Sequence, residues 1–522
     1  MRPRSTWRGA SPAGSSTPGP ARACAVFSRN KQRRATTVLA AEAGNPFVRG
    51  NDYGSLTRPS GDWKPHLSVS VVIPAHGHQD KLDIVLAALA AQTYPEELLE
   101  VIVVDDGTEP ALRLPERRPA NAKIVPPLPG GWASAHATNS GVERADGDVI
   151  VRLDSDMLAF ADHIESQLRW HHAADYLAVL GHKRFVDYKP GDLLPEHVFE
   201  AVKAGKAAEL FDTEASEPQW IEAIIDRTDG LKTADHRAFR VLVGASFSVP
   251  KAIYKASGGM DAEVILGSDT IFGYRLHQAG AVFVPDNDSS SWHLGPRQIA
   301  ARGEQAKRYR KPHIANRVPE LDLKRPRANR SWATPLADVF IDAGPGAEAA
   351  ADKILGGAVP DVRVTLLGEW PEPNPGRHAP LDDADLEARL LAESYRGEAR
   401  VRLAAQVEND QAVPYRISLP AQAKPRPWAI AVLVAHANEH RLGQLEVDIP
   451  GGTVKLVRTA AAARAEHLGA DIAQVWGAER VSEGELVEAF AGPKKSGPRD
   501  AGGSGQRLRR KARGAVRRLL GR

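Results

Sequence analysis

The feature that most constrains this chain is an apolar run, Val149 to Leu153, that ends in two carboxylates one residue apart. Such a run is typical of a buried β-strand, in which alternate side chains share a face. Asp154 and Asp156 would then point the same way at the strand's carboxyl end, where open α/β sheets bind ligands. Paired carboxylates repel each other unless a cation lies between them, and hard oxygen ligands suit Mg²⁺ or Mn²⁺ that also binds substrate phosphates. A polar strand end with a turn is the alternative.

The bulk composition limits the class of protein. The chain has 522 residues and a formal net charge of only +3, so its overall charge does not indicate a nucleic-acid partner, and its length suggests two or three domains. A single cysteine, Cys24, excludes an intramolecular disulfide and a thiolate metal cluster, and fits a reducing, cytosolic environment. The sequence shows neither a secretory signal nor an apolar run near the roughly 18 residues of a membrane span.

Two earlier predicted strands also end in polar residues. A β-rich run ends at residues 74–76, a helix is predicted over 81–92, and a buried strand at 101–104 leads into the acidic turn 105–107. This order predicts a βαβ unit with a parallel sheet. A second helix, at 133–145, then leads into the strand that carries Asp154, so we expect three strand ends to converge at one edge of the sheet.

Five short segments resemble, in order and spacing, motifs of the inverting family 2 glycosyltransferases, which have the GT-A fold. They are Ser70–Ala75 (SVVIPA), Gln92–Pro95 (QTYP), Val103–Gly107 (VVDDG), Ala137–Gly141 (ATNSG) and Leu153–Asp156 (LDSD). The resemblance covers roughly residues 67–292, about half of the chain. It implies the fold class α/β, a GT-A domain with a Rossmann-like mixed sheet and helices on both faces, and an enzyme that transfers a hexosyl or N-acetylhexosaminyl group.

The resemblance also implies a site for a UDP-sugar and a divalent cation, Mn²⁺ or Mg²⁺. Ala75 and His76 would line the base site, Asp106 would accept a hydrogen bond from the base, and Asp105 would support the turn. The Asp-x-Asp motif would hold ribose and metal, with Asp156 as a direct ligand. The expected donor-binding residues are Pro74, Ala75, His76, Asp105, Asp106, Asn139, Asp154, Ser155 and Asp156.

Two later positions complete the implied active site. Asp269 matches the family's catalytic base, and Ser268 stands where the family usually has a glutamate that contacts the acceptor. His293 follows the catalytic helix and a strand, and would be the third metal ligand with Asp154 and Asp156. A helix N-cap at Asp269 and a packed side chain at His293 are the alternatives.

The positive charge expected near a diphosphate is missing from its usual place. The family often has a basic residue just before Asn139, where this chain has Ala135 and His136, so the charge is either absent or supplied elsewhere. A basic stretch at residues 297–330 is one source, since a segment that closes over the diphosphate would stabilise a departing phosphate. A solvated helix face is the alternative reading of that stretch.

We expect four regions in the chain. Residues 1–66, rich in Arg, Ser, Pro, Gly and Ala, are predicted to be a disordered leader; a transit peptide or a misassigned start codon would also explain them. Residues 67–331 would form the GT-A domain, residues 332–490 a smaller C-terminal accessory α/β domain, and residues 491–522 a linker and a basic amphipathic tail.

The accessory region carries no recognisable chemistry in its sequence. Its predicted strands are 338–342, 362–367, 428–434 and 453–457, with a helix at 460–468. The order faintly repeats that of the first domain, so a degenerate half-copy of the nucleotide fold is one hypothesis. Acceptor binding and dimerisation are the others, and the sequence leaves the oligomeric state open.

The C-terminal tail has a helical pattern of apolar residues between arginines. Leu508, Val516 and Leu519 share one face, as in helices that lie on anionic membrane surfaces. We therefore expect a cytoplasmic protein, peripheral on the inner face of the cytoplasmic membrane. There are two alternatives. The tail could bind nucleic acid, although the charge of the whole chain does not indicate this, or it could only increase solubility.

Together these patterns predict a metal-dependent inverting transfer of sugar from a UDP-sugar to a hydroxyl of a cell-envelope glycan or glycolipid, with a lipid-linked or glycan acceptor. A nucleotidyltransferase is one alternative, although the chain lacks the early Gly-rich, Lys-containing phosphate loop expected of it. A non-catalytic scaffold that binds sugar nucleotides or polysaccharide is the other, suggested by Ser268 and Ala135.

Overall fold

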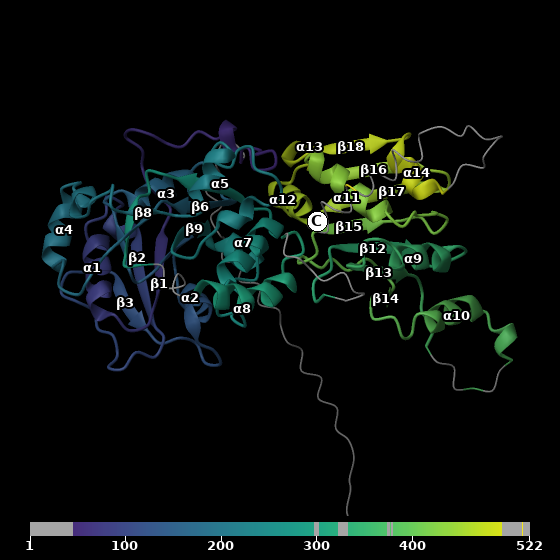
Figure 1. The fold of residues 1–522 in the computed structure, drawn as a ribbon, viewed down its shortest axis with the longest axis horizontal. Coiled ribbons are helices and arrows are strands. Elements are labelled where there is room, and N and C mark those ends of the chain that lie inside the picture. Colours follow the sequence, from purple (N-terminus) through teal and green to yellow (C-terminus); the bar gives the residue numbers. More distant parts are fainter. Residues whose placement is uncertain are drawn as a thin grey trace, which may run out of the picture. The chain divides into compact units, whose positions relative to one another are not determined.

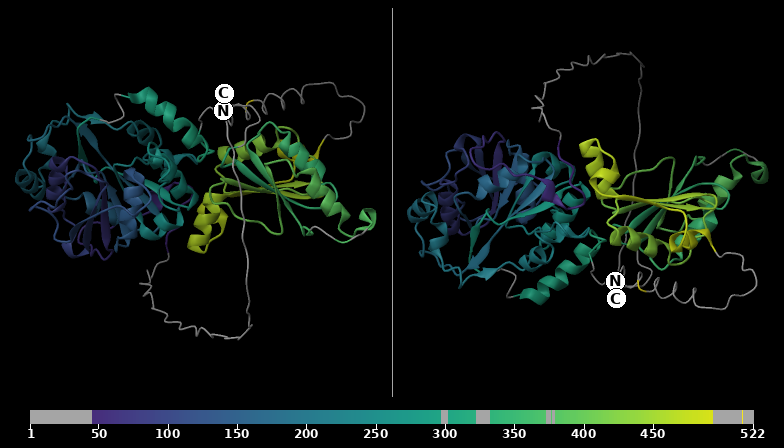
Figure 2. Two further views of the ribbon diagram at one scale, coloured as in Figure 1. Left: turned by 90° about the horizontal axis from the view of Figure 1, so that it is seen from below. Right: turned by 90° about the horizontal axis from the view of Figure 1, so that it is seen from above.

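The computed structural model describes residues 45–296, 302–321, 332–372, 376, 379–492 and 514, all within one compact unit. Two seven-stranded sheets with helices along their faces are formed by these residues (Figures 1 and 2). The strand order of the first sheet is β10-β6-β9-β4-β1-β2-β3, and all pairs are parallel except those of β9. Its strands are β1 (Val69–Ala75), β2 (Leu99–Asp105), β3 (Ala122–Val125), β4 (Val149–Leu153), β6 (Leu177–Gly181), β9 (Ser246–Pro250) and β10 (Val282–Asp286).

Both faces of this sheet are covered, as the continuous apolar runs predict. Alternate residues of β1 enter different cores: Val71 packs in the cluster that contains Leu82 of α1, and Val72 in the cluster that contains Val142 of α2. Gly141 allows α2 to approach β1 closely, because a Cβ there would lie 2.4 Å from Val72 Cγ1. The predicted strand–helix–strand unit and the α/β fold class are therefore confirmed.

The helices of this part of the chain alternate with its strands in the sequence. They are α1 (Gln79–Leu89), α2 (Ala133–Glu143), α3 (His163–His171), α4 (Pro195–Lys203), α5 (Glu222–Arg227), α6 (Lys251–Ala256), α7 (Ser268–Gln278) and α8 (Gly303–Ala315). In the described parts of the chain, no helix combines the length and apolarity that a transmembrane span needs.

A small four-stranded sheet positions the predicted metal ligands. Its order is β5-β11-β7-β8, with bounds Met157–Ala159, Ser291–Leu294, Arg184–Val186 and Glu217–Pro218. His293 in β11 pairs with Met157 of β5 on one side and with Phe185 of β7 on the other. Because β5 begins directly after Asp156, this pairing brings His293 to the turn that carries both aspartates.

The predicted disordered leader extended too far. From residue 45 the chain is ordered: Val48 and Tyr53 are buried in the first core, and the Asn51 amide exchanges two hydrogen bonds with the Phe283 backbone at 2.8 and 2.9 Å. Arg464 also donates to the carbonyl oxygens of Val48 and Gly50. A few apolar side chains in a polar segment are enough to dock it, which an average composition does not reveal. Residues 1–44 lie outside the described residues.

The second sheet follows in the C-terminal part of the chain, in the order β14-β13-β12-β15-β17-β16-β18. Its strands are β12 (Ala337–Asp342), β13 (Val362–Leu367), β14 (Val401–Ala404), β15 (Tyr415–Ser418), β16 (Gln444–Ile449), β17 (Gly452–Arg458) and β18 (Ala478–Val481). Its helices are α9 (Ala347–Leu355), α10 (Leu386–Ser394), α11 (Ala429–Glu439), α12 (Thr459–Leu468), α13 (Ile472–Val475) and α14 (Glu485–Ala491).

One predicted strand of this region was wrong. Of residues 428–434, Trp428 is the N-cap of α11 and the rest belong to that helix, in which Ala429 to Val434 are all buried. A helix that is covered on every side has the same continuous apolar run as a central strand, so periodicity cannot separate the two. Three of the seven buried residues of this helix are alanines, which favours the helix. The predicted amphipathic tail, apart from Gly514, lies outside the described residues.

Candidate active site

The turn between β4 and β5 brings the predicted metal ligands together. Carboxylate oxygens of Asp154 and Asp156 and a ring nitrogen of His293 all lie within 4.8 Å of one another. The Asp154 N–H donates to the Ala245 carbonyl, and the Leu294 N–H donates to the Asp156 carbonyl, so β11 and the segment before β9 both hold the turn. His293 Nε2 lies 3.6 Å from Asp156 Oδ1. Ser155 lies between the two aspartates in this turn.

The electrostatics of this turn suit a cation. The Asp156 side chain is only 13% exposed, and its burial, together with the neighbouring Asp154 charge, raises its pKa against the opposing effects of His293 and Lys81. The Nδ1 atom of His293 is buried without a hydrogen-bond partner in the described part of the chain. Two carboxylates and an imidazole form a donor set that fits Mn²⁺ or Mg²⁺, and a cation there would relieve the repulsion.

Lys81 in the first turn of α1 is a neighbour that the sequence did not reveal. Its Nζ lies 3.6 Å from Asp156 Oδ2 and donates to the Leu294 carbonyl. The helix that follows β1 therefore adds a positive charge beside the aspartate pair. In the sequence, Lys81 simply follows Asp80 at the start of a predicted helix, and nothing there indicates that it lies beside Asp156.

Arg152 supplies a second, buried charge. It lies in β4 two residues before Asp154, so the two side chains share a face; its Nη2 is 2.6 Å from Asp154 Oδ1 and 2.8 Å from Ser134 Oγ. Its Nε and Nη1 are buried and lack partners among the described residues. Ser134 is in the first turn of α2, beside Ala135, where the family's usual basic residue is absent. In the sequence, Arg152 is the only charged residue of the apolar run 149–153, and this could have indicated its role.

Lys183, between β6 and β7, is a third cation near the aspartates. It is 2% exposed, and its Nζ has no hydrogen-bond partner within the described ranges. Burial lowers the pKa of Lys183 to about 8, although Asp154, Glu222 and Asp269 act in the opposite direction. A buried ammonium without a partner costs folding free energy, so this position is unusual for a purely structural lysine.

The ends of β1 and β2 lie side by side, because Pro74 pairs with Val104 and Ala75 with Asp105. The Asp105 carboxylate accepts hydrogen bonds from the N–H groups of Thr108 and Leu112, at 3.0 and 2.9 Å, and these bonds hold the turn. This edge therefore offers a fixed backbone at the mouth of the sheet.

Asp106 links this edge to the start of α2. Its Oδ2 accepts the Ala133 N–H at 2.7 Å, and Ala133 has a left-handed backbone with φ of 72°. The ring of His76, which is exposed, lies 3.0 Å from the Asp106 carbonyl oxygen. The strained residue and its carboxylate partner occur where the predicted base site would be, and strain of this kind clusters at functional sites.

Asn139 has a packing role in the structure. Its amide donates to the Met260 carbonyl at 2.9 Å, and its Oδ1 accepts hydrogen bonds from the Tyr254 hydroxyl and the Met260 N–H, at 2.6 and 3.0 Å. The side chain therefore joins α2 to the segment that precedes α7. The expectation that Asn139 binds the donor directly is untested, and its hydrogen bonds are already made within the protein.

Asp269 lies in the first turn of α7, partly buried, and its Oδ1 accepts the Thr270 N–H at 2.8 Å. The turn before it depends on Gly267, whose φ is 97° and where a Cβ would lie 3.2 Å from atoms of both Arg310 and Ile314 in α8. The described part of the predicted basic segment is thus a helix packed on the turn that carries Asp269. Residues 297–301 and 322–331 lie outside the described residues.

The class of protein follows from this arrangement. A mixed sheet of this strand order, with an acidic metal-capable pair after β4 and a carboxylate at the start of α7, is the arrangement that the sequence resemblance predicts for a GT-A domain. The sequence model of the family described as Glycosyl transferase family 2 matches residues 70–230. Residues 70–230 therefore match glycosyltransferase family 2, the family that the sequence motifs resemble.

Two curated relatives match over part of their length. The chain is 25% identical to a hyaluronan synthase of Pasteurella multocida over 331 residues, which are 58% of this chain and 33% of that protein. It is 30% identical to a validoxylamine A glucosyltransferase of Streptomyces hygroscopicus subsp. limoneus over 237 residues, 42% of this chain and 50% of the relative. The chain thus spans half or less of the length of these relatives.

Among solved structures, S. aureus TarS residues 1–349 in complex with UDP-GlcNAc is similar with a TM-score of 0.32 and 15% identity. The similarity covers 44% of this chain and 59% of that one.

Proposed function

We propose that this protein is a glycosyltransferase that moves a hexosyl or N-acetylhexosaminyl group from a UDP-sugar to an acceptor hydroxyl, with inversion, and that it depends on a divalent cation. The observation that carries the proposal is the approach of Asp154, Asp156 and His293 ligand atoms to within 4.8 Å at the edge where β1 and β2 also end. The match of residues 70–230 to family 2 supports the reaction class.

In this proposal Asp154, Asp156 and His293 hold Mn²⁺ or Mg²⁺ against the donor diphosphate. The bound cation would supply Lewis-acid stabilisation of the charge on the departing UDP. Lys81 and Arg152 contact the aspartates and Lys183 lies near them, so all three add positive charge where a diphosphate would sit. They would replace the basic residue that is missing near Asn139.

Asp269 is the proposed general base. It would remove the proton of the acceptor hydroxyl while that oxygen attacks the anomeric carbon, and a single displacement inverts this centre. Its place in the first turn of α7, near Lys183 and buried only in part, leaves the carboxylate accessible to a substrate. Ser268 beside it cannot make the acceptor contact of a glutamate.

The nucleotide would bind along the ends of β1 and β2. His76 is exposed there and Asp106 has a second carboxylate oxygen, so they are the proposed contacts of the base, with Pro74, Ala75 and Asp105 shaping the site. Ser155 would lie beside the ribose and the metal.

The acceptor is proposed to be a cell-envelope glycan or glycolipid. One relative is named for hyaluronan synthesis and another for glucosylation of validoxylamine A. The proposed location, peripheral on the inner face of the cytoplasmic membrane, depends on the basic tail. The division at residues 331 and 490 into catalytic, accessory and tail regions also remains a proposal.

The decisive experiment measures UDP release from a panel of UDP-sugars with Mn²⁺, with Mg²⁺ and with a chelator. We expect metal-dependent UDP release in the wild type, and almost none in Asp269→Asn, which should still bind UDP because the carboxamide has the same shape. Pyrophosphate release would identify a nucleotidyltransferase instead. Binding of UDP-sugars without release in the presence of acceptors would identify a scaffold.

A further inference from the structure

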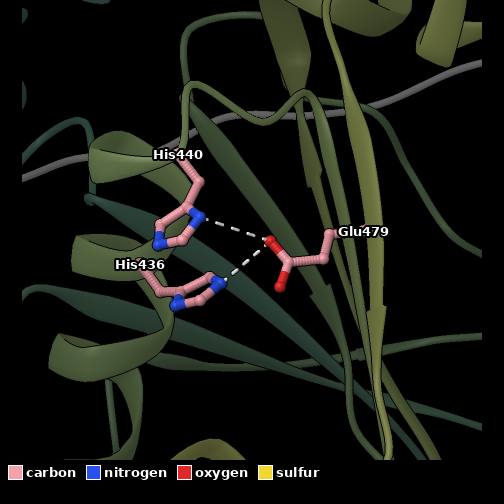
Figure 3. Close-up of side chains that lie close together, drawn as sticks. All are labelled: His436, His440 and Glu479. Atoms are coloured by element: carbon pink, nitrogen blue, oxygen red, sulfur yellow. Dashed lines mark hydrogen bonds and ion pairs between the residues drawn. The ribbon is translucent and has the colours of Figure 1, made fainter.

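A second group of possible metal ligands lies far along the chain from the aspartate pair. His436 lies in the last turn of α11, His440 is the C-cap residue that follows this helix, and Glu479 lies on β18 (Figure 3). One Glu479 oxygen, Oε2, lies 3.0 Å from His436 Nε2 and 3.6 Å from His440 Nδ1, and ligand atoms of all three residues lie within 4.8 Å of one another.

The fold accounts for this meeting of side chains. Residues four apart on a helix point to the same side, and the two imidazoles stack with centroids 4.0 Å apart and an interplanar angle of 15°. Glu479 is opposite Leu445 in the parallel pairing of β18 with β16. The carboxylate thus comes from a strand beside β16, and the imidazoles from the helix that packs against it.

A simple ion pair does not explain the group. The hydrogen bond between His436 Nε2 and Glu479 Oε2, at 3.0 Å, uses one imidazole only and does not account for the second ring stacked at 4.0 Å. Two imidazole nitrogens and a carboxylate oxygen that lie this close together can instead bind one cation. In tetrahedral zinc coordination with metal–nitrogen bonds of about 2.0–2.1 Å, ligand atoms are roughly 3.3 Å apart. The observed separations of 3.0 and 3.6 Å lie on either side of this value.

The surroundings add a second, independent observation. The three side chains line a hollow of about 560 Å³ together with Glu439, Glu483 and Glu485. In the described part of the chain, Glu485 Oε1 is buried and has no hydrogen-bond partner. An acidic hollow with an unsatisfied carboxylate oxygen favours a cation and a bound water. The side chains of His436 and Glu479 are 24% and 33% exposed, so a metal ion can enter.

We propose that His436, His440 and Glu479 bind one transition-metal dication of the zinc class, with solvent completing its coordination. Two imidazoles and one carboxylate form a softer donor set than Asp154, Asp156 and His293, so this site should prefer Zn²⁺ or Co²⁺ over Mg²⁺. The bound ion would join α11 to β18. The inference is independent of the proposed transferase reaction.

The test uses the full-length protein after removal of metals with a chelator. Zn²⁺ is titrated by calorimetry into the wild type, His436→Ala/His440→Ala, and His197→Ala, a control that removes an exposed histidine of α4. We expect the double variant to lose one zinc equivalent, or to bind it at least about 100-fold more weakly, since even indirect partners of a ligand change affinity about 10–100-fold. The control should match the wild type.

A second comparison separates the two sites. Asp154→Asn/Asp156→Asn should retain the zinc equivalent that His436→Ala/His440→Ala loses, and zinc should raise the melting temperature of the aspartate variant. If the double histidine variant does not fold, Glu479→Gln replaces it in the titration. This substitution keeps the side-chain shape and should also weaken zinc binding. Equal zinc titrations of the wild type and a folded His436, His440 or Glu479 variant would overturn the proposal.

Discussion

Arg458 Nη1 lies 3.1 Å from Glu320 Oε1, and both side chains are 1% exposed. Glu320 follows α8, whereas Arg458 ends β17, so the ion pair joins segments from different parts of the sequence. The Tyr415 hydroxyl donates to the same Glu320 oxygen at 2.9 Å. Burial raises the pKa of Glu320, and Arg458 and Tyr415 oppose this change by stabilising the carboxylate.

Removing one partner of this pair should be costly. Glu320→Ala leaves the Arg458 charge buried, so we expect the free energy of unfolding to fall by about 3–5 kcal/mol. The double variant Glu320→Leu/Arg458→Met should recover most of this loss, because it removes both buried charges. Urea unfolding checks both values; a loss below about 1 kcal/mol for Glu320→Ala would contradict the importance of the pair.

Stability should fall in mild acid because the protein holds buried neutral histidines. Burial lowers the pKa of His163 to about 4 and that of His171 to about 3. Between the ordinary histidine pKa of about 6.5 and these values the unfolded chain binds more protons than the folded one, so stability decreases as the pH falls. Each histidine contributes up to about 1.4 kcal/mol per pH unit in this window.

His171→Gln tests this pH dependence. Denaturation at pH 7, 6 and 5 should show a shallower loss of stability in this variant than in the wild type, by about one proton. The exposed His197 provides the matched control, since His197→Gln should leave the slope unchanged. An unchanged slope in the His171 variant would show that this residue does not carry the effect.

Lys183 should show a trade between stability and activity. Lys183→Met removes a buried ammonium whose pKa is about 8, so we expect the variant to be more stable at pH 7 by about 1–3 kcal/mol. Transfer from UDP-sugar should fall about 10²–10³-fold if Lys183 stabilises charge on the departing diphosphate. Lys189→Met, at an exposed position nearby in sequence, should change neither quantity much. A stable Lys183 variant with full activity would exclude the proposed role.

Gly267 should matter for the turn that carries Asp269. Gly267→Ala combines a left-handed backbone with contacts at 3.2 Å to Arg310 and Ile314, so transfer should decrease while UDP binding persists. Gly205→Ala has a similar φ of 70° but no neighbour within 4 Å, so it controls for backbone strain alone. UDP release and melting temperature measure the two effects; equal behaviour of both variants would exclude a special role for the contact with α8.

The sequence predicted the parts of the site that depend on local pattern. Strand ends with Asp105, Asp154 and Asp156 could be aligned because parallel strands bring their carboxyl ends to one edge. The placement of His293 came from the family resemblance, and the structure brings it to the aspartates through the pairing of β11. Lys81 and Lys183 were missed because nothing in their local sequence distinguishes them from ordinary surface lysines.

The errors have the same cause. Residues 429–434 form a helix because neighbouring strands and helices cover it on all sides, and that environment is not encoded in a seven-residue window. Val48 and Tyr53 order a segment of polar composition because they reach a core built by residues far away. Local pattern therefore predicted elements and strand ends, whereas pairing between distant side chains required the structure.

The contact between Arg464 and the Val48 and Gly50 carbonyls has a consequence for translation. More than 400 residues separate the arginine from these carbonyls, at sequence distances of 416 and 414. When the ribosome has synthesised all strands of the first sheet, it has not yet synthesised Arg464, which bonds to residues 48 and 50. Because domains fold as the chain emerges, residues 45–50 can first dock on Asp175 and Tyr176, and they gain the Arg464 hydrogen bonds only after α12 leaves the exit tunnel.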